Sequence, residues 1–113
     1  MTRRTERIGD LLLETLSELL LRDVKDPRIG LVTLTGVQVD DDLRRVRVRW
    51  TLLGGQGQRE GAQRGLESAA RFMQGKAARL LRMKFTPELH FEYDEGFDHA
   101  DQIGRLLRDL KKE

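Results

Sequence analysis

The run LRRVRVRWTLL at residues 43–53 constrains the fold of this chain more than any other segment. Apolar and basic residues alternate along it, and a period of two is the pattern of a β-strand with one apolar face and one charged face. The apolar set is Val46, Val48, Trp50 and Leu52, and the basic set is Arg45, Arg47 and Arg49. We therefore expect the apolar set, Trp50 included, to enter the core.

A second strand precedes this one. The run LVTLTGVQV at residues 31–39 is rich in β-branched residues, but its alternation slips by one position at Gly36. A β-bulge at Gly36 would return the apolar residues to a common face. The acidic run DDD at residues 40–42 then forms a polar turn, so the two strands are predicted to make a β-hairpin.

A helix is predicted before the hairpin. Apolar residues recur at helical spacing over residues 3–22, with charged residues between them. The following KDPRIG, residues 25–30, should end this helix, because Pro27 lacks an amide hydrogen and disfavours helix at Asp26. Gly30 gives the backbone freedom to turn into the first strand.

A longer stretch of helical periodicity follows the hairpin, over residues 58–84. It exceeds the usual length of an uninterrupted helix, so we expect two helices or one bent helix. Small side chains allow close approach at a kink, and Gly75 is one candidate position for it. The other candidate, which we favour, consists of Ser68, Ala69, Ala70 and Arg71.

The C-terminal part adds one more strand. Pro87 ends the helical segment, and ELHFEY at residues 88–93 alternates with its apolar residues inward. Asp98 can cap a short final helix, and residues 108–113 are expected to fray.

These elements follow the order α-β-β-α-α-β with a short C-terminal helix. Helices interspersed with only three strands cannot cover both faces of a sheet, so we expect a two-layer α+β sandwich. The chain has 113 residues, enough for one core but not for two, and we expect a single domain over residues 1–113.

Composition argues against several classes of function. The chain has no cysteine, which excludes disulfide scaffolds, thiolate metal sites and cysteine nucleophiles. Acidic residues interrupt the apolar run near the N-terminus, so we expect neither a secretory signal nor a membrane span. The two histidines lack metal-ligand spacing, and the acidic residues around them have a plainer use in capping and solvation. No serine has a histidine and an acid at a spacing that suggests a triad, so we do not expect an enzyme.

Positive charge gathers in residues 64–84, which hold six basic residues and a single acid, Glu67, in a chain of net charge +2. A local excess of this kind is what a polyanion-binding surface requires. On an unbroken helix three of the arginines would lie within about 20° of one another, opposite the apolar stripe. These three are Arg64, Arg71 and Arg82. The predicted RNA-contacting residues are Arg64, Arg71, Lys76, Arg79, Arg82 and Lys84. A solvated helix face is the alternative.

The strand arginines Arg45, Arg47 and Arg49 form a second basic cluster, on the face of the sheet away from the helices. If the third strand lies alongside, these arginines can pair with carboxylates such as Glu92 and Asp94. We favour this cross-strand pairing over contact with RNA.

Three more arginines, Arg3, Arg4 and Arg7, open the first helix, where the helix dipole disfavours cations. Contact with RNA and a plain surface role are equally open for them. Aromatic residues are few, and Trp50 shares the apolar phase of its strand, which favours recognition by shape and backbone charge over base stacking on the sheet.

The segment GGQGQREG at residues 54–61 is a glycine-rich loop. It lacks the Lys and Ser/Thr of a phosphate-binding P-loop. Its tripeptide Gly54-Gly55-Gln56 resembles the catalytic tip of peptide release factors, so a hydrolase is one alternative. We favour a flexible linker, because glycines in such numbers mainly mark turns and loops.

The order of the elements, together with four segments, resembles the ribosome-binding factor A family, whose members have a type II KH-like fold. The resemblance covers nearly the whole chain. Its segments are KDPRIG (25–30), VRVRWTLL (46–53), LESAARFMQGKAARLLRMKFTPELHFEYDEG (66–96) and ADQIGRLL (100–107). It implies a protein that binds the small (30S) ribosomal subunit, contacts 16S ribosomal RNA and assists late maturation of both without catalysis.

The same resemblance implies a cytoplasmic monomer with no cofactor, no metal, no membrane contact and no small-molecule substrate, and makes other assembly factors, including a GTPase, candidate partners. Members often carry Ala-x-Gly at the kink between two helices, and here Ala69-Ala70-Arg71 places arginine where glycine is common. A general KH-like RNA-binding or protein-interaction module, not specific to the ribosome, is the alternative function.

Overall fold

The computed structural model describes residues 3–53 and 58–96. Their elements follow the order α1 (Arg3–Arg22), β1 (Val32–Val39), β2 (Arg45–Leu52), α2 (Arg59–Leu80) and β3 (Glu88–Tyr93). The first helix and the three strands occur where the sequence predicts them. The tripeptide Gly54-Gly55-Gln56, the predicted C-terminal helix and the end expected to fray lie outside the described residues.

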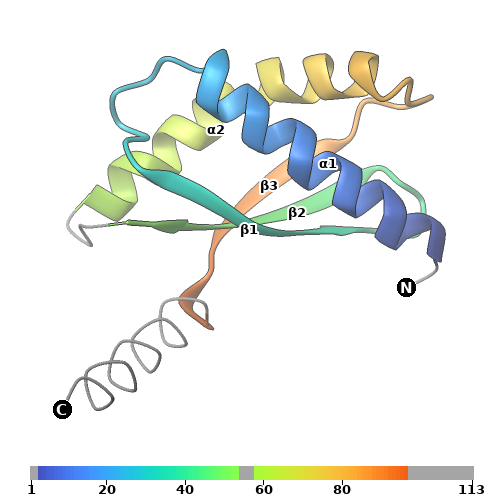
Figure 1. The fold of residues 1–113 in the computed structure, drawn as a ribbon, viewed down its shortest axis with the longest axis horizontal. Helices are drawn as coiled ribbons and strands as arrows, with labels where there is room; N and C mark the ends of the chain where they lie inside the picture. Colours follow the sequence, from blue (N-terminus) through green and yellow to red (C-terminus); the bar gives the residue numbers. More distant parts are fainter. Residues whose placement is uncertain (1–2, 54–57, 97–113) are drawn as a thin grey trace, which may run out of the picture.

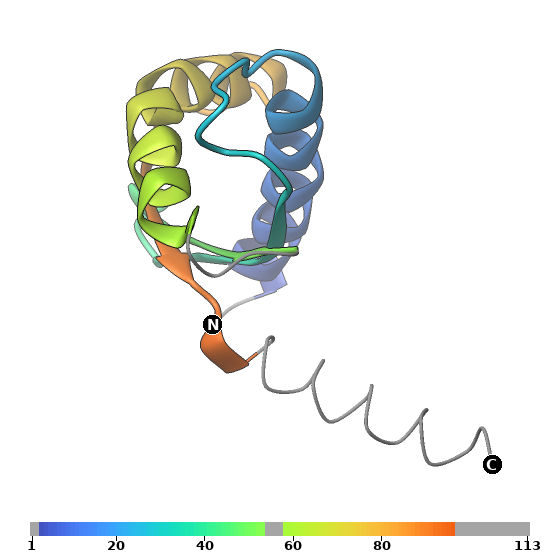
Figure 2. The same ribbon diagram turned by 90° about the vertical axis from the view of Figure 1, so that its left-hand side faces the viewer.

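The elements form two layers. The strands make one sheet in the order β1-β2-β3, with β1 and β2 antiparallel and β2 and β3 parallel. Figures 1 and 2 show both helices on the same face of this sheet, which confirms the predicted two-layer α+β arrangement. The central strand is therefore β2, the one with the clearest alternation in the sequence.

The predicted order with two helices between the second and third strands is wrong. The stretch between β2 and β3 is one helix, α2, so the described order is α-β-β-α-β, with no second helix before β3. Figures 1 and 2 show that α2 changes direction part-way along its length, which agrees with the alternative of one bent helix. The helix continues through the bend because its sequence has no proline, so no backbone N–H is missing from its hydrogen-bond ladder.

The end of α2 also differs from the prediction, because the helix stops short of residue 84. Arg82 has a φ of 52°, in the left-handed region. Its amide donates to the Arg79 carbonyl at 3.2 Å, and the Met83 amide donates to the Ala78 carbonyl at 2.9 Å. These two hydrogen bonds make a Schellman motif, in which one left-handed residue ends the helix.

The β-bulge predicted at Gly36 is present. The pairing of β1 with β2 shifts between Leu34 and Gly36, so Thr35 is an extra residue on β1. This insertion keeps the apolar residues on both sides of the bulge facing the helices. The Thr35 hydroxyl donates to the Asp94 carboxylate at 2.7 Å, which ties the bulge to the end of β3.

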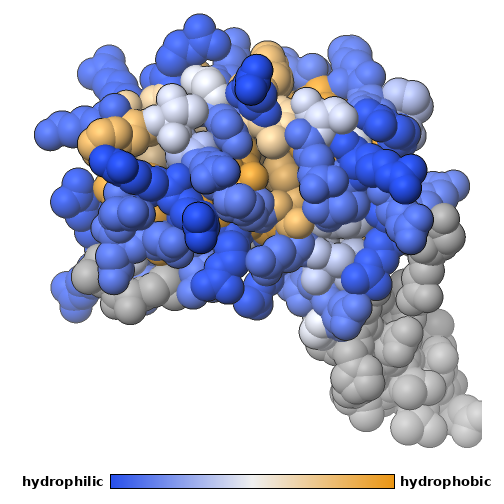
Figure 3. Space-filling view, turned by 180° about the vertical axis from the view of Figure 1, so that it is seen from behind, coloured by the Kyte–Doolittle hydropathy of each residue, from blue (hydrophilic) through white to orange (hydrophobic). Residues whose placement is uncertain are grey.

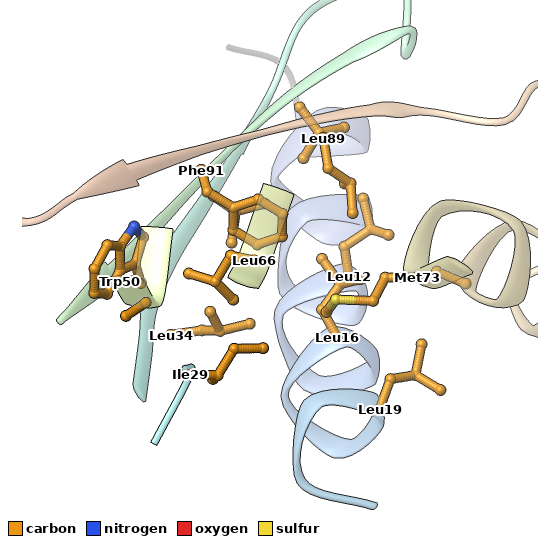
Figure 4. Close-up of a cluster of buried hydrophobic side chains, with 14 of the residues drawn as sticks. Leu12, Leu16, Leu19, Ile29, Leu34, Trp50, Leu66, Met73, Leu89 and Phe91 are labelled. Atoms are coloured by element: carbon orange, nitrogen blue, oxygen red, sulfur yellow. The ribbon is translucent and has the colours of Figure 1, made fainter. Parts of the chain in front are cut away.

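The core lies between the sheet and the two helices (Figure 4). Trp50 is fully buried, as predicted, and its ring meets that of Tyr93 edge-on with 5.0 Å between centroids. The indole N–H donates to Gln63 Oε1 at 2.8 Å, and the Gln63 amide donates to the Phe91 carbonyl at 2.8 Å. One side chain of α2 therefore satisfies the buried indole and also holds β3.

The connection between α1 and β1 packs against α2. Ile29 is buried there and packs closely against α2 at Gly65, which has no side chain. The Arg28 guanidinium contacts the Asp26 carboxylate at 2.6 Å and donates to the Ser68 hydroxyl at 3.2 Å. The hydrogen bond from the Arg28 side chain lowers the pKa of Asp26 below its ordinary value, and the same bond raises the pKa of Arg28.

Candidate nucleic-acid interface

The helix α2 turns its cations to solvent because its opposite side belongs to the core. Leu66, Met73 and Ala77 are fully buried. The predicted contact residues on this helix are Arg64, Arg71 and Arg79, which are exposed, and Lys76, which is half-buried. Figure 3 shows the molecule from the side of α2, and hydrophilic residues cover most of that face. The arginines of α2 thus lie away from the core as predicted, but Leu80, which was expected in the apolar stripe, is 58% exposed.

The predicted contact residues are not neutralised within the described part of the chain. They are Arg3, Arg4, Arg7, Arg64, Arg71, Lys76, Arg79, Arg82 and Lys84. Among residues 3–53 and 58–96, none of these nine side chains takes part in an ion pair or a hydrogen bond. Their charges are therefore available for phosphate oxygens, the anions that basic surfaces bind on nucleic acids.

Two other arginines are occupied within the molecule. Arg28 holds Asp26, and Arg59 contacts the Glu95 carboxylate at 3.0 Å while its guanidinium lies 3.9 Å from the centroid of the Tyr93 ring. These contacts give Arg28 and Arg59 a role in holding the fold together.

The predicted helical alignment of three arginines is wrong for one of them. Arg64 and Arg71 both lie on α2, but Arg82 follows the end of that helix and has left-handed backbone geometry. Helical spacing cannot be extended past the Schellman motif, so Arg82 does not share their helix face. Lys84 also lies beyond the helix, in the loop that leads to β3.

The fold instead brings these two cations to the beginning of α1. A cavity of about 270 Å³ lies between the first half of α1, the β1–β2 turn and the α2–β3 loop. Figure 1 shows these three segments at the same end of the molecule. Arg4, Arg82 and Lys84 line the cavity, together with apolar side chains that include Phe85. The other two predicted cations of α1 are exposed outside it.

The strand arginines lie on the opposite face of the sheet, because the residues that alternate with them are buried under the helices. The parallel register places Arg45 beside Glu88 and Arg49 beside Glu92, so the third strand does lie alongside, with Glu92 in the position favoured for pairing. No salt bridge joins these residues in the described structure, so the favoured ion pairing across the strands is not formed. The adjacent carboxylates nevertheless offset the positive charge of that face.

The predicted kink residues lie within α2. Ser68 accepts the hydrogen bond from Arg28, Arg71 is exposed, and Ala69 and Ala70 are partly buried against the core. The small alanines therefore lie on the inner side of the helix and the arginine on its outer side. Their part in bending α2 stays a prediction.

Other kinds of site find no support in the described residues. Residues 3–53 and 58–96 contain no group of three or more His, Asp or Glu side chains that could hold a metal ion. Of the acidic residues near the histidines, Asp94 and Glu95 lie in this part, whereas Asp98 and Asp101 lie outside the described residues. Neither of the described helices, α1 and α2, contains an apolar stretch that could span a bilayer.

The sequence did not reveal the cavity residues Leu43 and Phe85, nor the contact of Phe85 with Arg44. The Phe85 side chain is 49% exposed, and the Arg44 guanidinium lies 4.9 Å from the centroid of its ring. The only signal was an aromatic residue directly after Lys84, at the end of a basic segment. Nothing in the sequence joins that position to the turn after β1, because the two are brought together by the sheet.

Comparisons with known proteins agree with this fold. The family model of ribosome-binding factor A matches residues 4–107. The ribosome-binding factor A of Geobacter sulfurreducens is 39% identical over 113 residues, covering 100% of this chain and 96% of that protein. That of Staphylococcus saprophyticus is 38% identical over 112 residues, covering 99% and 98%.

Solved structures give the same result. The crystal structure of ribosome-binding factor A from Thermus thermophilus superposes with a TM-score of 0.69 at 28% identity, over 79% of this chain and 94% of that one. A homology model of the Thermus factor, fitted into the cryo-EM map of a complex with 30S, has a TM-score of 0.62 at 30% identity and covers 74% and 88%. By sequence and by fold, this chain belongs to the ribosome-binding factor A family.

Proposed function

We propose that this protein binds the small (30S) ribosomal subunit, contacts 16S ribosomal RNA and assists a late step in the maturation of both, by binding and not by catalysis. The observation that carries the proposal is the set of nine cations without partners among the described residues. Membership of the family supports the choice of partner, as does the Thermus relative fitted into a 30S complex.

Phosphate contacts are the recognition mode that this surface favours. Arginine and lysine side chains bind phosphate oxygens and fix the position of a protein on RNA without reading its sequence. The sheet aromatics Trp50 and Phe91 are buried and cannot stack on bases. We infer that the fold is a variant of the type II KH-like architecture, in which the bent α2 takes the place of two helices and Arg71 takes the place of the kink glycine.

Assistance in maturation requires a difference in affinity between two states of the subunit. A bound protein shifts a conformational equilibrium only by as much as it prefers one state, so this factor should bind an immature subunit more tightly than a mature one. Equal affinity for the two would refute a role in maturation. We expect it to act in the cytoplasm as a monomer without a cofactor, with other assembly factors, including a GTPase, as candidate partners.

The test compares two pairs of substitutions that remove the same charge from opposite faces. Arg71→Gln with Arg79→Gln removes two cations from the outer side of α2, whereas Arg45→Gln with Arg49→Gln removes two from the sheet. Each lost phosphate contact lowers the slope of log affinity against log salt by about one, so the α2 pair should lower it by about two. Co-sedimentation with precursor 30S subunits over a salt titration measures this slope.

The sheet pair should leave both affinity and slope near those of the unmodified protein, because carboxylates neighbour its arginines. An equal loss for both pairs, or no loss for the α2 pair, would remove the assignment of the interface to α2. Binding to free RNA that is as tight as binding to subunits would favour a general RNA-binding module.

A further inference from the structure

We propose that the cavity between α1, the β1–β2 turn and the α2–β3 loop binds one unstacked nucleotide of single-stranded RNA. Arg4, Arg82 and Lys84 hold its phosphate, and the apolar side chains hold its base. This inference rests on the proposed function and deepens it. The exposed cations of α2 bind phosphates only, whereas the cavity adds a place for a base.

The charge of the cavity selects an anion. Its lining includes three cations and no acidic residue. None of the three cations has an internal partner among the described residues. Three unpaired cations around one cavity repel one another, and a phosphodiester group relieves that repulsion while accepting their hydrogen bonds.

The apolar part of the cavity has the character of a base-stacking surface. Phe85 is 49% exposed and Leu11 is 44% exposed, so both offer apolar area to a ligand. Arg44 lies over the Phe85 ring at 4.9 Å from its centroid. Aromatic rings and guanidinium planes are the surfaces on which unpaired RNA bases stack.

Backbone strain is concentrated at the same place. Among residues 3–53 and 58–96, two non-glycine residues have positive φ, Leu43 at 62° and Arg82 at 52°, and both line this cavity. A bulky residue pays a conformational cost in this region, and such strain clusters at binding sites. Glycine is the usual residue at the position of Arg82 in a Schellman motif. An arginine there is explained by the use of its side chain at the rim of the cavity.

The size of the cavity favours one nucleotide over a folded segment of a protein partner. One turn of an α-helix, with a diameter of about 10 Å and a pitch of 5.4 Å, occupies about 420 Å³. The cavity, at about 270 Å³, is smaller than that. The bases of an RNA duplex are paired and stacked, so a base that enters the cavity comes from a single strand.

The test measures binding of fluorescein-labelled hexauridylate and hexaadenylate by anisotropy, next to an abasic ribose-phosphate hexamer of equal charge. Phe85→Ala should weaken binding of the two base-containing hexamers by about 5- to 150-fold, the range for losing one base–aromatic stack. It should leave binding of the abasic hexamer unchanged. Phe72→Ala is the matched control, because Phe72 is 47% exposed on α2 and does not line the cavity.

A second variant, Arg82→Gly, separates binding from folding. Glycine relieves the left-handed strain, so the melting temperature should hold or rise. The affinity for all three hexamers, the abasic one included, should nevertheless fall, because a phosphate contact is lost. A melting temperature that falls together with affinity would mean that Arg82 serves the fold.

Other outcomes would refute the proposal that the cavity binds a nucleotide. Equal losses for Phe85→Ala and Phe72→Ala would show that stacking is not confined to the cavity. If Phe85→Ala weakened co-sedimentation with subunits but not binding of the hexamers, the occupant would be a protein. The hexamer assay contains no ribosomal subunit, so it can fail while the α2 comparison succeeds, and the reverse also holds.

Discussion

Gly65 lies inside α2, where the connection between α1 and β1 crosses the helix. A Cβ atom added there would stand 2.8 Å from Cγ1 of Ile29 and 3.4 Å from a carboxylate oxygen of Asp26. Real Cβ atoms do not approach other heavy atoms to 2.8 Å. Ile29 is only 5% exposed and its Cγ1 is near the backbone, so it cannot swing into solvent. We predict that Gly65→Ala pushes the connection away from α2.

Two opposing effects decide the magnitude. Replacing glycine by alanine within a helix stabilises it by about 1 kcal/mol. Overpacking a close contact costs about 1–3 kcal/mol. Gly65→Ala should therefore lower the free energy of unfolding by between zero and about 2 kcal/mol. Gly61 and Gly75, on the same helix, have no heavy atom within 4 Å of an added Cβ. Alanine at either should show only the gain.

Thermal unfolding followed by far-UV circular dichroism compares the three variants. The difference between Gly65→Ala and the two controls should be about 1–3 kcal/mol, or about 4–12 °C in Tm at roughly 4 °C per kcal/mol for a chain of this size. If all three alanines raised Tm equally, the contact between the connection and α2 would not exist in solution. That result would also contradict the packing that places Arg28 beside Ser68.

Two further predictions concern polar contacts. Gln63→Leu should lower the free energy of unfolding by about 1–3 kcal/mol, because it leaves the indole N–H of Trp50 and a β3 carbonyl without partners. Denaturant unfolding, followed by the fluorescence of this sole tryptophan, measures the loss. An unchanged free energy of unfolding would mean that water replaces the Gln63 amide. Asp26→Asn tests the lowered pKa of Asp26. A carboxyl whose pKa is lower in the folded state than in the unfolded state, about 3.9, stabilises the fold above the unfolded-state pKa. That stability is lost as pH falls through the folded-state pKa. The difference in stability between the unmodified protein and Asp26→Asn should therefore be constant from about pH 7 to pH 5 and shrink below about pH 4, and a difference unchanged at pH 2 would contradict the role of the Arg28 contact.

Local patterns in the sequence were enough for the strands and the first helix. The slip of alternation at Gly36 located the β-bulge, because a period of two tolerates an inserted residue only by bulging. The phase of Trp50 placed it in the core for a similar reason. These features depend on neighbours along the chain, which the sequence displays directly.

Features that depend on distant segments were not accessible in this way. Helical periodicity is the same for one bent helix and for two helices, so the α2 segment left both open. The left-handed geometry of Arg82 could not be predicted either, because the usual sequence signal for such a position is glycine. The cavity beside Arg82 needs the start of α1 and the turn after β1, which only the sheet brings together.

The two basic surfaces differ in the residues that stand next to each arginine. On the sheet, Arg45 and Arg49 neighbour Glu88 and Glu92 in the register of β2 and β3. An RNA strand approaching that face would meet carboxylates as well as guanidinium groups, and the repulsion would cancel part of the gain. On α2, Arg64, Arg71 and Arg79 are without an internal partner among the described residues, as are Arg4 and Arg82 at the cavity. A surface whose cations have no internal partner gains more from an anionic ligand than one whose cations stand beside carboxylates, and this supports the proposed interface on the helix layer.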